Sequence, residues 1–117
     1  MAHFALIENN VVTNIIVVAN DNCGGGTFPP SELIGQEFIS SLGFEGNWKQ
    51  CSYNNNFRKQ YPYVGFTYDP ISDVFVKWSP FASWILDENH DWEAPVPKPD
   101  GNYWWNETNQ EWVLYTD

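Results

Sequence analysis

One short pattern occurs three times in the second half of the chain, at residues 66–75, 84–92 and 104–112. Each copy has large aromatic or aliphatic residues, then Asp or Asn, a few polar residues, and an aromatic residue again. Aromatic residues favour strands, and Asp, Asn, Pro and Ser form tight turns. The pattern therefore predicts three β-hairpins, and their starts lie about 18 to 20 residues apart, a period that suits one hairpin and a connector.

The N-terminus predicts another hairpin. Residues 4–8 and 11–19 are rich in apolar and β-branched types, and Asn9 and Asn10 separate them. Asn tolerates the left-handed conformation that a tight hairpin turn requires. Because residues 11–19 are almost continuously apolar, we expect this strand at the centre of the sheet with both faces covered.

A single helix is predicted over residues 30–42. Pro30 suits a first helical turn, Ser31 is expected to cap it, and Glu32 complements the positive end of the helix dipole. Gly43 follows where a left-handed residue ends many helices. The helix is expected to pack on the N-terminal sheet through an apolar stripe that consists of Leu33, Ile34, Phe38, Ile39 and Leu42.

The whole chain of 117 residues is interpreted as an α+β protein that is mainly antiparallel β. Its seven Trp, six Tyr and eight Phe favour strands over helices. The N-terminal hairpin and the helix on a sheet are followed by three aromatic hairpins. We expect one domain over residues 1–97, and a last hairpin in residues 98–117 on a Pro-rich arm, docked on the domain or on a neighbouring subunit.

The formal net charge of −10 argues against nucleic acid and anionic membranes as partners, because both are bound through clustered Lys and Arg. The start of the chain does not have the pattern of a signal peptide, and no stretch is long enough for a membrane span. We therefore expect a soluble protein that is made in a cytoplasm. Cys23 and Cys51 could form one disulfide or remain two buried thiols, of which we favour the thiols.

The charges are unevenly distributed. Residues 87–117 contain eight acids and one base, whereas residues 48–78 contain four bases and two acids. Such an asymmetry could set the register of a homo-oligomer, or it could simply keep a solvated surface soluble, which is the more common case. The candidate self-association charges are Arg58, Lys59 and Lys77.

No motif predicts catalysis. His3 and His90 are the only histidines, and neither has metal-ligand spacing to another His or to a Cys. The glycines at 24–26 lack the Lys-Ser/Thr that follows a phosphate-binding loop. We expect no enzymatic activity, no metal and no cofactor.

The excess of aromatic residues is the best indication of function. Aromatic rings beside amides and carboxylates suit sugars and protein interfaces, although Trp also fills the thin core of a small β domain. For most of the tryptophans we favour the core, with two or three at an interface. The candidate ligand or partner surface consists of Trp92, Tyr103, Trp104, Trp105 and Trp112.

An ordered set of short motifs resembles a family of short uncharacterised proteins from tailed phages of marine bacteria, especially cyanophages. The resemblance covers nearly the whole chain, and its segments lie at residues 1–5, 11–14, 46–54, 56–59, 65–69, 82–87, 92–97 and 105–112. It implies a phage origin, a location in the virion after synthesis in the host cytoplasm, and contacts with other virion proteins. It supplies no catalytic residues.

Together these features favour a non-catalytic virion structural or interaction protein, such as a capsid decoration or a tail-fibre-associated component. It would act as a symmetric homo-oligomer in which the last hairpin exchanges contacts between subunits. The alternative is a module that recognises host surface polysaccharide through exposed Trp. A third hypothesis, a small protein that binds a host factor, has less support.

Overall fold

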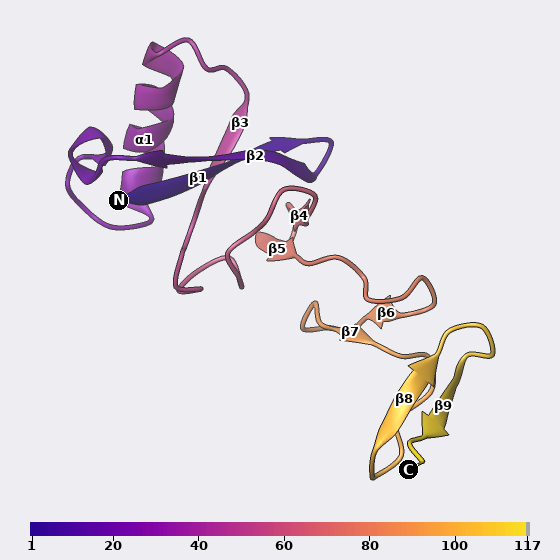
Figure 1. The fold of residues 1–117 in the computed structure, drawn as a ribbon. Helices are drawn as coiled ribbons and strands as arrows, with labels where there is room; N and C mark the ends of the chain where they lie inside the picture. Colours follow the sequence, from indigo (N-terminus) through magenta and orange to yellow (C-terminus); the bar gives the residue numbers. More distant parts are fainter. Residues whose placement is uncertain (117) are drawn as a thin grey trace. The chain divides into compact units, whose positions relative to one another are not determined.

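The computed structural model describes residues 1–116 (Figure 1). The chain forms two compact units, Met1–Trp78 and Ser79–Asp117. The boundary that the sequence suggested near residue 97 falls inside the second unit. The fold is mainly antiparallel β with one α-helix in the described residues, so the predicted α+β class is confirmed.

The N-terminal unit contains a five-stranded sheet in the order β3-β1-β2-β4-β5, in which all neighbouring strands are antiparallel. Figure 1 shows the first hairpin of this sheet, with α1 beside it. A short 3₁₀ helix follows β2 at Asn20–Cys23. The strands are β1 (Ala2–Glu8), β2 (Val11–Val18), β3 (Asn47–Cys51), β4 (Thr67–Asp69) and β5 (Val74–Val76).

The hairpin of β1 and β2 turns at Asn9 and Asn10, whose φ angles of 52° and 62° are left-handed, as predicted. β2 is the middle strand in the sheet order, but the expectation that both of its faces are covered was wrong. Val17 is 51% exposed. The physical reason is that Val17 pairs with His3 and so lies on the face away from the helix, at the end of β2 opposite to its pairing with β4.

Successive side chains of β1 point to opposite faces of the sheet, and each face has its own buried cluster. Phe4 belongs to one cluster, which also contains Ile39 of the helix. Ala5 and Ile7 belong to the other, which also contains residues of β4 and β5. The helix therefore covers one face of the sheet, and aromatic side chains of its own hairpin and loops cover part of the other.

Helix α1 spans Pro30–Ser41, close to the predicted range, but the predicted buried stripe was largely wrong. Its buried residues are Ser31, Gly35 and Ile39, so only Ile39 of the predicted stripe is buried. Gly35 explains the difference, because a Cβ at this position would lie 2.3 Å from Cζ of Phe4. Close packing on this small residue turns three of the larger apolar side chains outward, namely Leu33 (62% exposed), Ile34 (43%) and Leu42 (56%).

The polar residues at the start of α1 bind the sheet. Ser31 makes no cap hydrogen bond, contrary to the prediction, and its Oγ donates to Gln50 Oε1 at 2.8 Å instead. The carboxylate of Glu32 accepts a hydrogen bond from the backbone N–H of Gln50 at 2.8 Å. Gln36 Nε2 donates to the carbonyl of Trp48 at 2.6 Å. These side chains therefore bind the outer edge of β3 where a further strand would otherwise pair.

The C-terminal unit contains two separate two-stranded sheets. The three predicted aromatic hairpins are all present: the first is β4–β5 of the N-terminal unit, and the other two make up the C-terminal unit. The strands of this unit are β6 (Ile85–Leu86), β7 (Trp92–Glu93), β8 (Tyr103–Asn106) and β9 (Glu111–Leu114).

The three hairpin turns have the same construction. A side-chain oxygen of Asp69, Asp87 or Asn106 accepts backbone N–H groups of the turn. A left-handed residue then leads into the second strand, with φ of 56° at Asp73, 62° at His90 and 50° at Gln110. The repeated sequence pattern therefore reflects a repeated turn geometry.

The core of the C-terminal unit is a group of indole rings. Trp84 contacts Trp105 and Trp112 with centroid distances of 6.1 Å each, and the last two rings are 5.1 Å apart. Glu107 accepts hydrogen bonds from Ser83 and from Trp105 Nε1. The last hairpin therefore docks within its own unit.

Candidate functional site

The five aromatic residues predicted as a binding surface mostly belong to the packing of the C-terminal unit. Trp105 is buried, whereas Trp92, Tyr103 and Trp112 are partly buried. Trp104 is the most exposed of the five, at 40%. In the described residues, these five side chains therefore do not form a continuous surface of exposed indole rings.

A pocket of about 530 Å³ in the C-terminal unit uses one of these residues. Trp84, Trp112 and the Pro-rich residues 94–98 line it. Trp112 Nε1 donates to the carbonyl of Val96 at 2.8 Å, so the Pro-rich segment itself is held against the last hairpin. This indole N–H is therefore used for the fold.

The most exposed group of neighbouring aromatic rings lies in the N-terminal unit, in and around the loop that follows β3. Tyr53 is 69% exposed, Tyr63 61% and Trp78 58%. We call these rings and the residues around them the tyrosine surface, which consists of His3, Tyr53, Asn55, Gln60, Tyr61, Tyr63, Phe66, Lys77 and Trp78.

The rings of the tyrosine surface form one continuous row. Tyr53 stacks on His3 at 5.5 Å, and Tyr61 meets both rings edge-on. Tyr63 contacts Tyr61 at 6.3 Å and lies nearly parallel to the indole of Trp78, at 13° and 6.5 Å. Phe66, which is buried, supports both Tyr63 and Trp78 from the side.

Backbone geometry holds these rings in place. Gly65 has φ of 99°, and a Cβ there would lie 2.8 Å from Trp78 Nε1, so the absence of a side chain leaves room for the indole. The N–H of Gly65 donates to the carbonyl of Val12 at 2.8 Å, which ties the loop to β2. Asn55 Oδ1 accepts a hydrogen bond from the N–H of Tyr61 at 2.7 Å. The surface is therefore attached to the sheet at several points.

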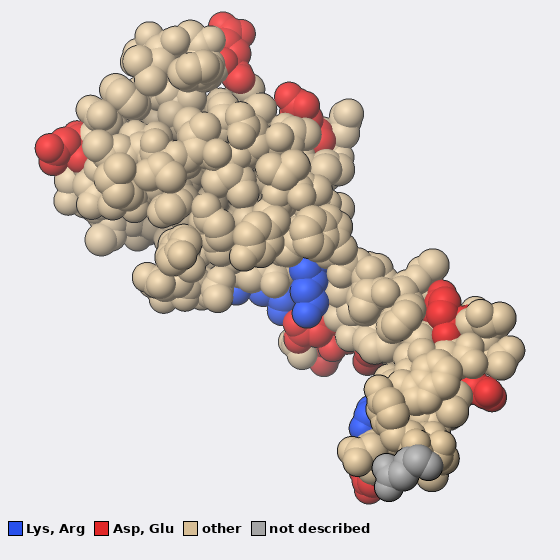
Figure 2. Space-filling view, viewed as in Figure 1, with Lys and Arg blue, Asp and Glu red and all other residues tan. Residues whose placement is uncertain are grey.

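A hollow of about 650 Å³ lies on the tyrosine surface. Its lining contains four aromatic rings, the amides of Asn55 and Gln60, and Lys77, with no Asp or Glu. This local charge is opposite to the net charge of the chain, which has 15 acids and five Lys and Arg. On the face drawn in Figure 2, most of the visible Lys and Arg side chains gather in one area, with Asp or Glu side chains directly beside them.

His3 and Tyr61 are two groups of the row whose pKa the surroundings shift, and both shifts favour the neutral form. Burial lowers the pKa of His3, and the positive N-terminal amino group lowers it further. Burial raises the pKa of Tyr61, and the neighbouring Cys51 and tyrosines add to this effect. His3 Nδ1 and the Tyr61 hydroxyl lie 3.2 Å apart. The neutral imidazole of His3 and the neutral hydroxyl of Tyr61 therefore lie within the row of rings, and Lys77 lines the same hollow as Tyr61.

The predicted self-association charges have different surroundings. The side chain of Arg58 is 6% exposed and forms ion pairs with Glu32 and Asp73. Its guanidinium also donates to the carbonyl of Gln50 at 2.8 Å and lies 5.0 Å from the ring centroid of Phe28. The charge of Arg58 is therefore used within the N-terminal unit.

Lys59 is partly buried, and Lys77 is exposed. Lys77 belongs to the tyrosine surface defined above, where it follows β5. A role for Lys59 and Lys77 in self-association stays a prediction.

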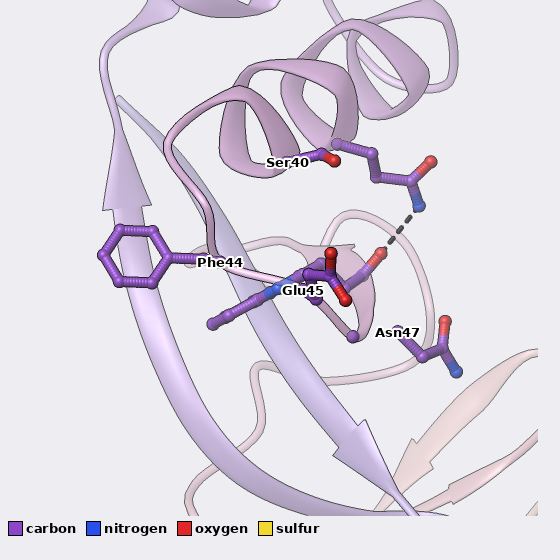
Figure 3. Close-up of a pocket in the computed structure, with 7 residues that line it drawn as sticks. Ser40, Phe44, Glu45 and Asn47 are labelled. Atoms are coloured by element: carbon purple, nitrogen blue, oxygen red, sulfur yellow. Dashed lines mark hydrogen bonds between the residues drawn. The ribbon is translucent and has the colours of Figure 1, made fainter.

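A second hollow in the N-terminal unit, of about 350 Å³, lies between the end of α1 and the start of β3 (Figure 3). Gln36 and Trp48 line it and are joined by the hydrogen bond described above, which is dashed in the figure. Phe44 points away from Ser40 and Glu45. Trp48 Nε1 is buried without a hydrogen-bond partner in the described structure.

Within residues 1–116, no three His, Cys, Asp or Glu side chains lie close enough together to hold a metal ion. No helix in this part of the chain is long and apolar enough to cross a membrane. Cys23 and Cys51 are buried free thiols, as favoured above. Burial raises the pKa of Cys51 to about 12, although Arg58 opposes the shift.

Comparison with models of known families, with curated proteins and with solved structures finds no match for this chain. The tyrosine surface was also missed by the sequence analysis. Its residues come from β1, from the loop after β3 and from the segment after β5, so no periodic pattern joins them. The one available signal was the excess of Tyr and Phe in residues 53–68.

Proposed function

We propose that this chain is a non-catalytic binding protein of a phage particle, and that the tyrosine surface is where it contacts its partner. The observation that most supports this proposal is the exposure of Tyr53, Tyr63 and Trp78. Each side chain is more than half exposed, and all three belong to one row of rings. Apolar surface gains about 25 cal/mol per Å² when it leaves water. Tyr and Trp are also enriched among the residues that dominate binding energy at interfaces.

The contrast with the C-terminal unit supports this choice of surface. There the indoles of Trp84, Trp105 and Trp112 pack on one another, and two of their N–H groups bind Glu107 and Val96. Those rings already have a structural role. The rings of the tyrosine surface are held by the fold, but three of them remain open to solvent.

The proposed location in the virion rests on the resemblance to marine phage proteins, and purified particles provide a direct test of it. Quantitative mass spectrometry of purified particles should detect the chain at a fixed copy number. Its presence only in infected-cell lysate, and not in washed particles, would contradict the assignment.

The role of the tyrosine surface is tested with particles that carry the chain, by measuring their adsorption to host cells. The double variant Tyr53→Ser/Tyr63→Ser should stay on the particles and lower their adsorption. Tyr115→Ser is the matched control, because Tyr115 is 62% exposed and lies in the C-terminal unit. Equal adsorption of particles with either variant would place the contact elsewhere.

A further inference from the structure

We infer that the ligand of the tyrosine surface is a polysaccharide, whose sugar rings stack on Tyr53, Tyr63 and Trp78. This inference rests on the proposed function, because it names the ligand class of the same surface. A sugar ring has an apolar face of C–H groups and a rim of hydroxyls. It therefore suits a site where flat aromatic faces alternate with hydrogen-bonding groups.

The row of rings fits a repeating chain better than a single small molecule. It runs without interruption from His3 and Tyr53 through Tyr61 and Tyr63 to Trp78. Tyr53 and Tyr63 both meet Tyr61 edge-on, at 66° and 90°, with ring centroids 5.4 and 6.3 Å away, so each ring presents a different face or edge along the row. Several sugar units of one chain could thus contact the row at once. Each contact contributes little binding free energy, but together they give a useful affinity.

The polar groups around the row match the hydroxyl rim of a sugar. The amide of Asn55 uses its oxygen for the N–H of Tyr61, and an amide also has two N–H donors. Gln60 Nε2 donates to the carbonyl of Phe75 at 3.0 Å, and its amide oxygen is an acceptor. Such groups fix the orientation of a ligand that the rings alone would hold only loosely.

The composition of the lining separates this site from a permanent protein interface. Obligate interfaces resemble a domain core cut in half, whereas the lining of this hollow contains no Leu, Ile, Val or Met. The exposed aliphatic side chains Leu33, Ile34 and Leu42 belong to α1 instead. An aromatic, amide-bearing lining favours a carbohydrate as the occupant.

Lys77 is the one charged residue in the lining of the hollow, and it predicts a preference among polysaccharides. An ammonium group attracts a carboxylate or sulfate within the screening length of about 8 Å at physiological salt. Acidic chains should therefore bind more tightly than neutral chains. The preference should weaken as salt is added.

The experiment measures binding of the full chain to three probes, by calorimetry and by ¹⁵N chemical-shift mapping. The probes are alginate oligosaccharides, sulfated carrageenan oligosaccharides and the neutral glucan laminarin. We expect Tyr53→Ala/Tyr63→Ala to weaken binding at least tenfold and Tyr115→Ala to leave it unchanged. Lys77→Gln should weaken binding of the acidic probes and leave laminarin unaffected, whereas Lys98→Gln should change neither.

Thermal unfolding checks that each variant is folded, and the single variant Tyr53→Ala serves if the double variant is not. Shift changes confined to Trp84 and Trp112 would overturn the inference, as would no binding of any probe at millimolar concentration. Formation of a dimer that Tyr63→Ala dissociates would identify a second copy as the occupant and also overturn it. If adsorption of the particles still depends on Tyr53 and Tyr63, the proposed function stands without the polysaccharide.

Discussion

Arg58 joins three elements of the N-terminal unit with one side chain. Its guanidinium binds Glu32 of α1, the carbonyl of Gln50 in β3 and Asp73 at the start of β5. Its own carbonyl accepts the N–H of Phe75 at 3.1 Å. Because the planar guanidinium donates several hydrogen bonds in fixed directions, Lys could not replace all of these contacts.

Replacing Arg58 by Met should lower the free energy of unfolding by about 3 kcal/mol, because it leaves the carboxylate of Glu32 partly buried without its cation. Urea unfolding followed by circular dichroism measures the change. Arg58→Lys should recover only part of the loss. A decrease below about 0.5 kcal/mol for Arg58→Met would show that the ion pairs contribute little to stability.

Gly35→Ala should destabilise the protein although Ala favours helix. The new Cβ would lie 2.3 Å from Cζ of Phe4, whose side chain is fully buried and has no room to move. Overpacking costs about 3 kcal/mol at its upper end, against about 1 kcal/mol gained from helix propensity. The net loss should appear as a lower urea midpoint.

Gly26→Ala is the matched control, because a Cβ there meets nothing within 4 Å and its φ is not positive. It should leave the urea midpoint unchanged or raise it slightly. Similar losses for both variants would show that the close approach of Gly35 to Phe4 is not what limits this position.

At the level of single residues, the sequence predicted what depends on neighbours in the chain. The left-handed pair Asn9 and Asn10 is an example, because a two-residue turn is a local property. The roles of Arg58 and Gly35 depend on partners at Glu32 and Phe4, far away in the sequence. No local pattern indicates such partners.

The elements show the same division between local and distant information. The helix and the hairpins were predicted because periodicity and turn residues define them. The buried face of α1 was not, since close packing at Gly35 rotates the helix away from the orientation that the apolar stripe suggested, although Ile39 stays buried. The candidate site was largely missed, because aromatic residues count equally in a sequence whether they are buried, like Trp105, or exposed, like Tyr53.

The hairpin β4–β5 is joined to the rest of its unit through Asp73. Burial opposes the charge of this carboxylate, but hydrogen bonds from Tyr68 and Arg58 outweigh that effect, and its pKa lies below the ordinary value of 3.8. A lowered pKa in the folded state stabilises the protein above the pKa of the unfolded chain. This contribution is lost as the pH falls through the lower folded value.

Asp73→Asn should therefore unfold more easily than the original protein at pH 6, and the difference should shrink toward pH 2. Urea unfolding at pH 6, 4 and 3 measures it. Asp69→Asn, at the other end of the same turn, is the matched control and should be less destabilised at pH 6, because an Asn oxygen can still accept the backbone N–H groups of Ile71 and Ser72. If the free energy of unfolding changed with pH in the same way for the original protein and Asp73→Asn, the carboxylate of Asp73 would not have this stabilising role.

At the scale of the whole molecule, all five strands of the large sheet and both buried clusters described above lie within residues 1–78. The Trp core of the C-terminal unit uses only residues after 79. Each unit thus has its own core, which is the usual condition for independent folding.

A chain truncated after Trp78 should fold cooperatively and retain the amide chemical shifts of the sheet. A chain truncated after residue 97, the boundary expected from the sequence, should aggregate more and give less well dispersed spectra. It removes Trp105 and Trp112 but keeps Trp84, whose ring would lose both contacts. Size-exclusion chromatography and ¹⁵N spectra compare the two chains, and a better-behaved 1–97 chain would favour the earlier boundary.

The side chains that bind the outer edge of β3 affect how the protein behaves at high concentration. An open sheet edge offers unpaired N–H and C=O groups to strands of other molecules, which is a common route to aggregation and amyloid. Here Glu32, Gln36 and Arg58 already bind Gln50 and Trp48 along that edge. A protein present in many neighbouring copies, as on a particle surface, can then be packed at high local concentration without strand addition at β3.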